Sequence, residues 1–461
     1  MPHSSDFSLT LNEVADVCNA QTVGISEDSV IRGVSTDTRA LAPGELFFAL
    51  EGETHDGHDY LTQALEAGAV AAVVSQPAAV PEGLPAIIVD DTEIALGRIA
   101  AAHRSRMGAK IAAITGSTGK TTTKDMLGDI MSLAGPAVVA HGTQNNEIGV
   151  PLTLLRLTSE HEFGVLELAM RGPGEIDYLA EMVLPDVGVI TNIGQSHVGR
   201  LGSREAIAQA KAELLEHLSG DGAAVLNADD FFFSVFTAMT ECDVISFGIA
   251  ADADFHAREI DDARLDGVSF ELVTPSAEAK VTMQVPGRHN VLNALAAAAA
   301  ASRLGASLEK VVAGLESYQG SAMRTQRVTG PNGSTIINDA YNASPDSVAA
   351  ALDLLRAAPA DRRIFVFGDM LEMGPEAEPA HRAVGDAAKE AGVDHLVAVG
   401  RLAALAATRA QELGLHADSV SDTDEARAIL ADELAPGDVM LVKGSRGMQL
   451  ERIVEALSDG N

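Results

Sequence analysis

One stretch of the chain has the residue types of a phosphate-binding loop. Residues 115–123 read TGSTGKTTT and follow the apolar run 110–114, which is typical of a buried strand. A glycine-rich loop between a strand and a helix lets backbone N–H groups and the helix N-terminus surround phosphates. The loop is a shortened Walker pattern, because Ile114 stands where that pattern has its first glycine. We expect Lys120 to contact the β- and γ-phosphates of a nucleotide and Thr121 to ligate Mg²⁺.

A lysine on an apolar helix face is the second chemical signal. Residues 203–218 have helical periodicity, and Lys211 occupies the position that the apolar stripe of Ile207 and Leu214 leaves open. An inward-facing lysine loses hydration, so its pKa falls, and a neutral amine can capture CO₂ as a carbamate, an anionic oxygen ligand for a metal. Alternatively, its stem covers apolar surface while the amine reaches water. The pattern alone leaves both interpretations open.

Two further polar side chains follow predicted strands. Glu167 lies in the apolar run 163–168, and His197 follows the run 187–193. Because the carboxyl ends of parallel strands meet at one edge of a sheet, we expect this pair to ligate Mg²⁺ beside the glycine-rich loop, near Lys211. For either residue alone, a helix cap or a hydrogen bond in the core is an equally ordinary role.

Amides and a carboxylate mark two other loops. Asn290 and Asn293 stand at the start of a predicted helix, residues 289–305, where they either read an adenine edge or cap the helix. Asp339 follows the predicted strand 335–337, and its carboxylate suits a ribose hydroxyl, although an Asx turn also explains an acid there. Both loops are candidate nucleoside contacts.

A sheet is needed to position these side chains. From residue 108 to about 321, apolar runs that end in glycine or polar residues lead into helical patterns, which predicts a mostly parallel sheet covered by helices. Residues 322–461 repeat the alternation and predict a smaller Rossmann-like domain. Residues 1–107 hold short strands and helices between turn signals. The sequence therefore predicts an α/β protein of three domains: 1–107, a central P-loop domain 108–321, and 322–461.

Composition and charge exclude several classes of protein. The chain has 461 residues, of which 46% are hydrophobic and 21% are charged, as in globular proteins and unlike disordered ones. Its 66 acidic and 32 basic residues give a net charge of −34, which repels nucleic acid. An anionic substrate would need metal ions and local cations to overcome this field, so we expect Mg²⁺ dependence at a nucleotide site.

Cysteine usage and hydropathy indicate a compartment. Cys18 and Cys242 allow no thiolate metal cluster and at most one disulfide, which suits a reducing cytoplasm. Residues 1–17 have neither a basic start nor an apolar core, and the small-apolar run 291–301 is too short to span a bilayer. We expect a cytoplasmic protein without membrane insertion.

Together these stretches resemble the Mur ligase family. The resemblance spans nearly the whole chain and is carried by residues 35–39 (STDTR), 56–58 (DGH), 115–121, 145–151 (NNEIGVP), 289–293 (HNVLN), 337–345 (INDAYNASP), 367–374 (FGDMLEMG) and 442–447 (VKGSRG). Residues 145–151 and 368–372 distinguish this chain from members of the family that add other groups.

The resemblance implies an ATP-dependent amide ligase that joins D-alanyl-D-alanine to UDP-N-acetylmuramoyl-tripeptide through an acyl phosphate, in peptidoglycan synthesis. It implies a UDP-sugar domain, a central ATPase domain and a mobile C-terminal domain that closes over the central one. The partners expected are the two substrates, ATP and two Mg²⁺ ions, and we expect a monomer.

The resemblance also assigns roles to individual residues. ATP would be bound by Gly116, Ser117, Thr118, Gly119, Lys120, Thr121, Thr122, Asn293, Arg324 and Asp339. Mg²⁺ would be bound by Thr121, Glu167, His197 and a carbamylated Lys211. The UDP-sugar substrate would meet Ser35, Asp37, Arg39, His55, Asp56, Gly57, His58, Asn145 and Asn146. The catalytic residues would be Lys120, His197 and Lys211.

The chain departs from the family pattern in two places. Many relatives carry an acidic residue shortly after the histidine, whereas residues 198–200 here read VGR. Residues 168–175 also differ, so no contact to the dipeptide is assigned there.

Two other functions fit parts of the pattern. One is a related ligase that adds a single amino acid, or a folate or cyanophycin type of ligase. The other is a nucleotide-gated switch, which the joint presence of Glu167, His197 and Lys211 disfavours because a switch needs no second metal site.

Overall fold

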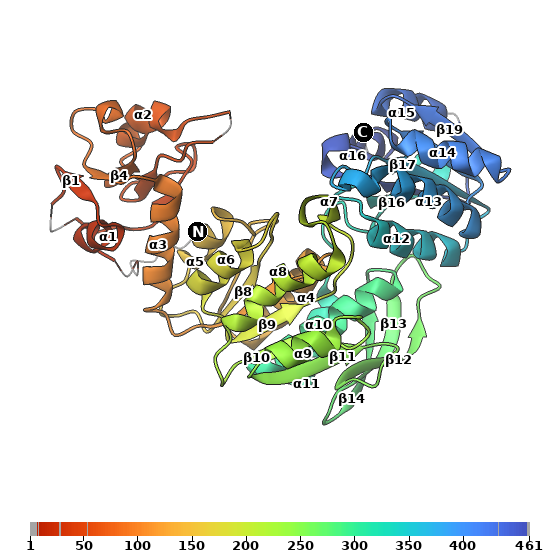
Figure 1. Cartoon of the computed structure of the whole chain (residues 1–461), viewed down its shortest axis with the longest axis horizontal. Coiled ribbons are helices and arrows are strands. Elements are labelled where there is room, and N and C mark those ends of the chain that lie inside the picture. The colour runs from red at the N-terminus through yellow and green to blue at the C-terminus, as the bar shows by residue number, and fades with distance from the viewer. Residues whose placement is uncertain (1–6, 8, 27–28, 53, 432, 459–461) are drawn as a thin grey trace.

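The computed structural model describes residues 7, 9–26, 29–52, 54–431 and 433–458. Its strands form three separate sheets in chain order, each with helices of its own. In Figure 1 the C-terminal domain rests on the central domain, while the N-terminal domain stands apart at the other end of the molecule. The predicted three-domain α/β fold is confirmed.

The N-terminal sheet has five strands in the order β1-β5-β4-β3-β2, and only β1 runs antiparallel to its neighbour. The strands are β1 (Gln21–Val23), β2 (Val34–Ser35), β3 (Leu46–Phe48), β4 (Ala71–Val74) and β5 (Ala86–Ile88). The helices are α1 (Leu11–Cys18), η1 (Gly57–Tyr60), α2 (Leu61–Glu66), η2 (Pro77–Ala79) and α3 (Thr92–Arg104). Helix α3 packs on α1 and also on two helices of the central domain, so it joins the two bodies.

The central sheet has nine strands in the order β14-β13-β12-β11-β10-β9-β6-β8-β7. The strands are β6 (Lys110–Thr115), β7 (Ala137–Val139), β8 (Phe163–Glu167), β9 (Val187–Ile190), β10 (Ala223–Asn227), β11 (Asp243–Gly248), β12 (Phe255–Asp261), β13 (Val268–Val273) and β14 (Glu278–Met283). The helices are α4 (Lys120–Ala134), α5 (Gly149–Leu154), α6 (Glu175–Val183), α7 (Val198–Leu201), α8 (Arg204–Glu216), α9 (Phe233–Met239), α10 (Arg288–Leu304) and α11 (Leu308–Ser317). Strands β6 to β12 pair in parallel, as predicted, and the antiparallel β13 and β14 extend the sheet at one edge.

Helix α10 covers one face of the central sheet. Its alanines at 294 and 296–301 are fully buried and pack against α4 and strands β10 to β12. Methyl side chains let a helix approach a sheet closely without leaving voids, so the alanine run is a packing surface.

The C-terminal sheet has six strands in the order β15-β16-β20-β17-β18-β19, and only β15 is antiparallel. The strands are β15 (Gln326–Thr329), β16 (Thr335–Asp339), β17 (Arg362–Gly368), β18 (His395–Val399), β19 (His416–Val420) and β20 (Asp438–Lys443). The helices are η3 (Pro331–Gly333), α12 (Pro345–Ala357), η4 (Gly374–Glu376), α13 (Ala377–Glu390), α14 (Ala403–Glu412), α15 (Thr423–Ala431), η5 (Arg446–Met448) and α16 (Glu451–Leu457). The edge strands β15 and β19 are polar and were not predicted.

Strand ends from the two larger sheets meet at one place. Glu167 ends β8, Asp339 ends β16 and Lys443 ends β20, and all three border one cavity between the central and C-terminal domains. The carboxyl edges of both sheets therefore face each other across it, where ligands of open α/β sheets bind. We keep 107 and 321 as proposed domain boundaries, since both fall between successive sheets.

Two further sequence expectations concern membranes and cysteines. Within the described residues, no helix combines the length and apolarity that crossing a bilayer requires. Cys18 and Cys242 are both free thiols. Burial raises the pKa of the Cys18 thiol to about 11, so this cysteine is an unreactive packing residue.

Candidate active site

A cavity of about 550 Å³ lies between the central and C-terminal domains. The sequence-predicted residues on its wall are Ser117, Thr118, Gly119, Lys120, Thr121, Thr122, Asn145, Asn146, Glu167, His197, Asn293, Arg324 and Asp339. Gly116 and Lys211 do not border the cavity, and neither do the predicted substrate residues of the N-terminal domain. Apart from Gly116 and Lys211, the predicted nucleotide and metal residues thus lie around one cavity, and the N-terminal group lies elsewhere.

The glycine-rich loop joins β6 to α4 and is held by the segment after β9. Ser117 N donates to Asn192 O (2.9 Å), and Thr191 Oγ1 donates to Thr118 O (2.6 Å). Gly116 and Gly119 have φ of +147° and +80°, and a Cβ at either would collide with Thr191 Oγ1 or Asn293 Oδ1 respectively. These glycines are required by close contacts as well as by backbone conformation.

Lys120 is the first residue of α4, and its amine folds back over the loop. Lys120 Nζ donates to Gly116 O (2.7 Å). Burial lowers the Lys120 pKa, the nearby Arg324 lowers it further, and Glu167 opposes both effects. The amine lies at the N-terminal end of α4, where the helix dipole also favours anions.

Glu167 lies at the centre of a hydrogen-bonded group of oxygen donors. Its side chain is 2% exposed; Oε2 accepts from Thr121 Oγ1 (2.7 Å) and Oε1 accepts from Asn145 Nδ2 (2.7 Å). The strand end of β8 therefore presents a fixed carboxylate beside the Thr121 hydroxyl of the glycine-rich loop.

His197 connects the two domains. It has a left-handed backbone (φ +68°) just before α7, and its Nδ1 lies 2.7 Å from Glu372 Oε2 of the C-terminal domain. Nδ1 is buried and makes no hydrogen bond of good geometry. His197, followed by Arg200 and Arg171, lowers the pKa of the Glu372 carboxyl against the opposing effect of burial.

Lys211 lies on α8 and is 1% exposed, so the predicted inward orientation is confirmed. Burial, and then the charge of Lys120, hold its pKa well below the ordinary value, while Glu167 opposes them. Both groups are therefore near enough to act on Lys211 electrostatically. A lysine whose amine reaches water from the surface does not fit this placement.

The two asparagines of α10 have different surroundings. Asn290 Nδ2 donates to Pro286 O (2.8 Å), and Asn290 Oδ1 accepts from Asn293 Nδ2 (3.1 Å). The Asn290 side chain is thus hydrogen-bonded within the first turn of α10. It orients Asn293, whose Oδ1 faces Gly119.

Asp339 and Arg324 form the opposite wall of the cavity. Asp339 Oδ2 pairs with Lys443 Nζ (2.5 Å), and Oδ1 accepts from Thr325 N (3.1 Å). The Arg324 guanidinium lies 4.0 Å from the centre of the Tyr341 ring, a cation–π contact that fixes its plane.

In the N-terminal domain, residues 35–38 are half-buried and Arg39 is exposed, and several hydrogen bonds link residues within this segment. Ser35 Oγ donates to Asp37 O (3.0 Å), and Arg39 pairs with Asp37 through NH2–Oδ2 (2.7 Å). The Arg39 hydrogen bonds lower the pKa of Asp37 to about 2, although the Arg39 side chain is 88% exposed.

Residues 55–58 include both exposed and buried side chains. His55 is exposed, whereas His58 is buried with Nδ1 2.6 Å from Asp56 Oδ1 and Nε2 accepting from Ser75 N (3.0 Å). A Cβ on Gly57 would lie 2.7 Å from the backbone of Ala49. His58 therefore orients this loop from its buried side and does not face solvent.

The sequence did not predict three side chains of the C-terminal domain that shape the site. Glu372 contacts His197, Tyr341 stacks on Arg324, and Asp346 Oδ2 accepts from Gln195 N (2.8 Å). Glu372 lies in the stretch 367–374, Tyr341 lies in the stretch 337–345, and Asp346 directly follows that stretch. The sequence stretches that carry the resemblance therefore include or adjoin these residues, but Glu372 and Asp346 gain their partners only when the two domains pack together.

Models of known families match each part of the chain. Residues 30–104 match "Mur ligase family, catalytic domain", residues 114–301 match "Mur ligase middle domain", and residues 323–446 match "Mur ligase, glutamate ligase domain".

Individual relatives match along nearly the whole chain. A UDP-N-acetylmuramoyl-tripeptide--D-alanyl-D-alanine ligase from Escherichia coli (strain K12) is 37% identical over 456 residues, covering 98% of this chain and 99% of that protein. Its counterpart from Bacillus subtilis (strain 168) is 37% identical over 94% of each chain.

Solved structures agree. Crystal structure I of MurF from Acinetobacter baumannii has a TM-score of 0.89 at 34% identity and covers 97% of this chain and 98% of its own. A MurF ligase from Thermotoga maritima, solved in complex with ADP, shares the fold with a TM-score of 0.81 at 24% identity, covering 93% of this chain and 98% of its own. The chain belongs to the Mur ligase family and is an ATP-dependent ligase.

Proposed function

We propose that this ligase joins D-alanyl-D-alanine to UDP-N-acetylmuramoyl-tripeptide, with cleavage of ATP to ADP and phosphate, in the cytoplasmic stage of peptidoglycan synthesis. The observation that carries the proposal is one cavity lined by the glycine-rich loop, Glu167, His197 and the C-terminal Asp339. Relatives of that activity match the whole chain, and the free thiols suit a reducing compartment.

The phosphates of ATP would lie on the loop. Backbone N–H groups at the start of α4 and the Lys120 amine supply positive charge there. Asn293 would face the adenine, Asp339 the ribose and Arg324 a phosphate. Local cations are necessary because the whole chain carries a net charge of −34.

The donor atoms fit Mg²⁺. Thr121 Oγ1 and both oxygens of Glu167 are hard donors held within hydrogen-bond distance of one another, which is what Mg²⁺ prefers. His197 would supply an imidazole nitrogen to a second ion, together with Lys211 as a carbamate, and the Glu372 carboxylate 2.7 Å from its Nδ1 would orient the ring. Bound Mg²⁺ would reduce the repulsion between the phosphates and an incoming carboxylate.

The burial of Lys211 supports the proposed carbamate. A neutral amine attacks CO₂, forms an N–C bond and releases one proton, which leaves an anionic carbamate. Because its environment lowers the Lys211 pKa, the neutral amine is more populated than at a surface lysine. The product replaces a buried cation with two oxygen donors.

The reaction itself needs an activated carboxyl group. The terminal carboxylate of the tripeptide attacks the γ-phosphorus of ATP, and the P–O bond to ADP breaks, giving an acyl phosphate. The free amine of D-alanyl-D-alanine then attacks the acyl carbon, loses its proton, and expels phosphate. Lys120 stabilises the negative charge that develops on the transferring phosphoryl group.

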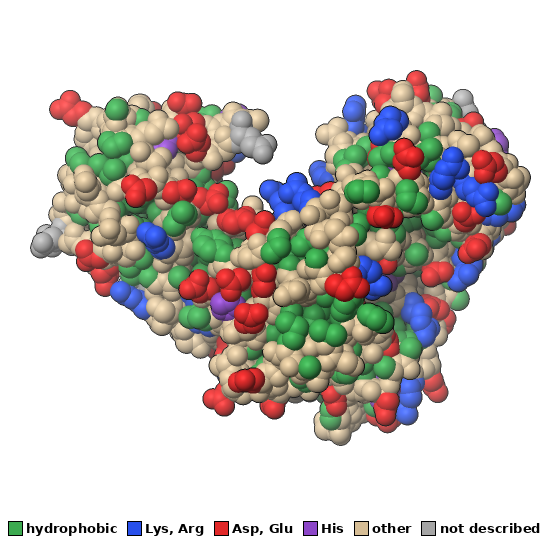
Figure 2. Space-filling model, viewed as in Figure 1, with side chains coloured by type: hydrophobic (Ala, Val, Ile, Leu, Met, Phe, Trp, Pro, Cys, Tyr) green, Lys and Arg blue, Asp and Glu red, His purple; other side chains and the backbone are tan. Residues whose placement is uncertain are grey.

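The UDP-sugar would bind between the N-terminal and central domains. Ser35, Asp37, Arg39, His55 and the backbone of Gly57 would contact it, with Asp56 and His58 orienting the loop. Asn145 and Asn146 would extend this site to the cavity wall. Figure 2 shows the molecule hollowed between the N-terminal and C-terminal domains, above the central one.

Water must be excluded because it would hydrolyse the acyl phosphate. We propose that domain closure does this, with the C-terminal domain docking on the central one through Glu372 on His197 and Asp346 on Gln195 N. We propose a monomer, since every residue invoked comes from one chain.

A coupled phosphate assay tests the function. With UDP-N-acetylmuramoyl-tripeptide, ATP, Mg²⁺ and D-alanyl-D-alanine present, phosphate release should be rapid and should fall to background when any one component is omitted. Faster release with a single amino acid or with glutamate than with the dipeptide would contradict the proposal and favour a related ligase.

A further inference from the structure

Three metal-ligating side chains gather at the edge of the C-terminal sheet, away from the active cavity. His395 begins β18, and His416 and Asp418 lie on β19. His395 on β18 lies directly opposite His416 on β19 in the parallel register. Asp418, two residues after His416 on β19, lies opposite Val397. Because side chains alternate along a strand, all three share one face of the sheet.

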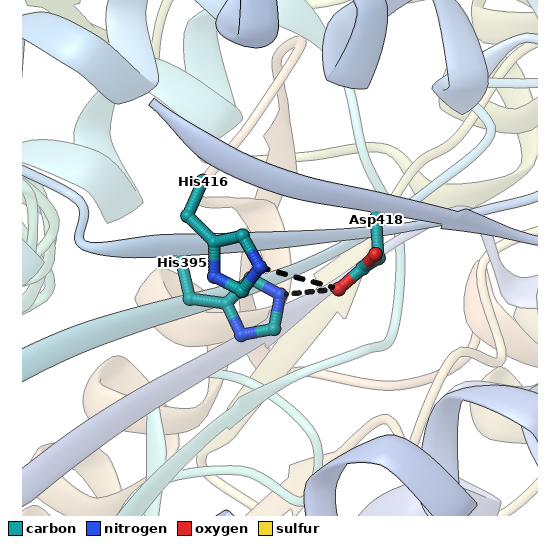
Figure 3. Close-up of side chains that lie close together, drawn as sticks. All are labelled: His395, His416 and Asp418. Carbon is teal, nitrogen blue, oxygen red and sulfur yellow. Dashed lines mark hydrogen bonds and ion pairs between the residues drawn. The ribbon is translucent and has the colours of Figure 1, made fainter. Parts of the chain in front are cut away.

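Their donor atoms already converge. Asp418 Oδ2 lies 2.9 Å from His395 Nε2 and 3.8 Å from His416 Nε2, and the three donor atoms all lie within 4.8 Å of one another. The two rings stack with centres 4.1 Å apart, and Figure 3 shows both directed at the Asp418 carboxylate. Ligands of a tetrahedral ion bound at about 2.0–2.2 Å lie roughly 3.3 Å apart, so the donor atoms are close to the required separation, and the exposed His416 ring would turn out of the stack to point its Nε2 at the same ion.

His395 is placed as a metal-bound histidine would be. It is buried, and its Nδ1 lies 2.8 Å from Glu433 Oε2 while its Nε2 faces Asp418. A neutral imidazole has a single N–H, so one ring nitrogen must present its lone pair to a carboxylate. A cation bound by both Nε2 and the Asp418 carboxylate satisfies both groups.

Glu433 is itself held in place by Arg362. Arg362 NH1 lies 3.2 Å from Glu433 Oε1, and Arg362 NH2 donates to Glu433 O (2.8 Å). A held carboxylate on the Nδ1–H of a histidine directs its Nε2 lone pair at the metal and raises its basicity. His395 thus has both a ligand direction and an outer partner.

We propose that His395 Nε2, His416 Nε2 and the Asp418 carboxylate bind a divalent first-row transition ion of the Zn²⁺ class. Two imidazoles with one carboxylate suit such ions, whereas Mg²⁺ and Ca²⁺ prefer all-oxygen sites. The His416 side chain is 67% exposed, so water can reach the site and complete the coordination.

The site is separate from catalysis. It lies at the amino-terminal ends of β18 and β19, whereas the active cavity lies at the carboxyl ends of β16 and β20. Its effect would be to tie the edge strand β19 to its neighbour, so binding should raise the thermal stability of the chain.

Zn²⁺ titration of the full chain by calorimetry, in excess Mg²⁺, tests the proposal. The wild type should bind one more Zn²⁺ equivalent than His416→Ala and Asp418→Asn, and Zn²⁺ should raise the unfolding temperature of the wild type more than that of either variant. Any Zn²⁺ bound in the catalytic cavity is common to all three proteins, so it does not affect the difference in stoichiometry between them. His217→Ala, which removes a surface histidine paired with Asp177 (2.7 Å), is the matched control and should behave as the wild type.

Two results would overturn the site: equal Zn²⁺ stoichiometry in the wild type and His416→Ala, or loss of the same equivalent in His217→Ala. Glu433→Gln gives an independent check, because loss of an outer partner should weaken Zn²⁺ binding about 10- to 100-fold without removing the equivalent. Unchanged affinity in that variant would contradict the role given to Glu433.

Discussion

The polar side chains of the active cavity and those of the N-terminal loops are held in opposite ways. Glu167 is 2% exposed and has both oxygens hydrogen-bonded by residues distant in sequence. Arg39 is 88% exposed and pairs with Asp37, two residues away. The cavity is therefore preorganised by the fold, whereas the N-terminal loop depends on a local turn.

This difference separates two kinds of contribution. Buried, oriented dipoles and charges stabilise developing charge without reorganisation, so they raise kcat. Exposed groups that make contact only when substrate arrives contribute binding, so they lower KM. Substitutions in the two regions should divide accordingly.

Lys120→Ala should have the largest effect. Removing this charge from the phosphate-binding loop should lower kcat by about 10²–10³-fold, with little change in KM for the UDP substrate. Steady-state phosphate release measures both constants. A decrease in kcat of less than about tenfold would contradict the assignment of Lys120 to the preorganised charges of the cavity.

Lys211→Ala should lower activity by roughly 100-fold, because the proposed carbamate ligand would be lost from the proposed metal site. A short carboxylic acid should restore part of it by supplying oxygen donors at the vacated position. Lys124→Met is the matched control, because Lys124 is also 1% exposed. Its Nζ donates to Ala140 O and Gly142 O, so the short carboxylic acid should not restore any activity that this variant loses. Equal restoration of both variants, or none of Lys211→Ala, would contradict the carbamate.

Arg39→Ala should raise KM for the UDP substrate about tenfold while leaving kcat and the KM for ATP unchanged, as loss of one charged contact implies. Arg264→Ala is the matched control, since Arg264 pairs with Asp266 in the same two-residue spacing (2.7 Å) outside both sites. A lowered kcat in Arg39→Ala would contradict the claim that the N-terminal loop contributes to substrate binding and the cavity to kcat.

Glu372→Gln should have the smallest effect, about two- to fivefold on kcat/KM, because its ion pair with His197 is half exposed and screened. The pKa of Glu372 is lowered, so its stabilising contact is present above the ordinary carboxyl range and is lost as pH falls through the lowered value. Protection factors of the Gly374 and Glu376 amides, taken relative to their intrinsic exchange rates, should therefore fall at acid pH in the wild type, and protection factors that do not change with pH would contradict the docking role.

The sequence predicted the parts of the site that are local. The glycine-rich loop, Glu167 at a strand end and Lys211 in an apolar stripe follow from strand and helix periodicity, and the buried position of Lys211 is confirmed. The carbamate and the metal ligands remain predictions.

Contacts between domains could not be predicted in the same way. Glu372, Asp346 and Tyr341 acquire their partners only when two separately folded bodies dock, and no periodicity encodes that orientation. The edge strands β15 and β19 were missed because they are short and polar, which hides the alternation expected of a half-buried strand. The His395–His416–Asp418 cluster depends on the register of β19 and was missed for the same reason.

Isotope transfer tests the central claim most directly. If the terminal carboxylate of the tripeptide is labelled with ¹⁸O and turned over with ATP and D-alanyl-D-alanine, an acyl phosphate requires one ¹⁸O atom to appear in each inorganic phosphate released. Phosphate without the label, formed alongside the amide product, would show that the carboxylate never attacks the γ-phosphorus and would contradict the account.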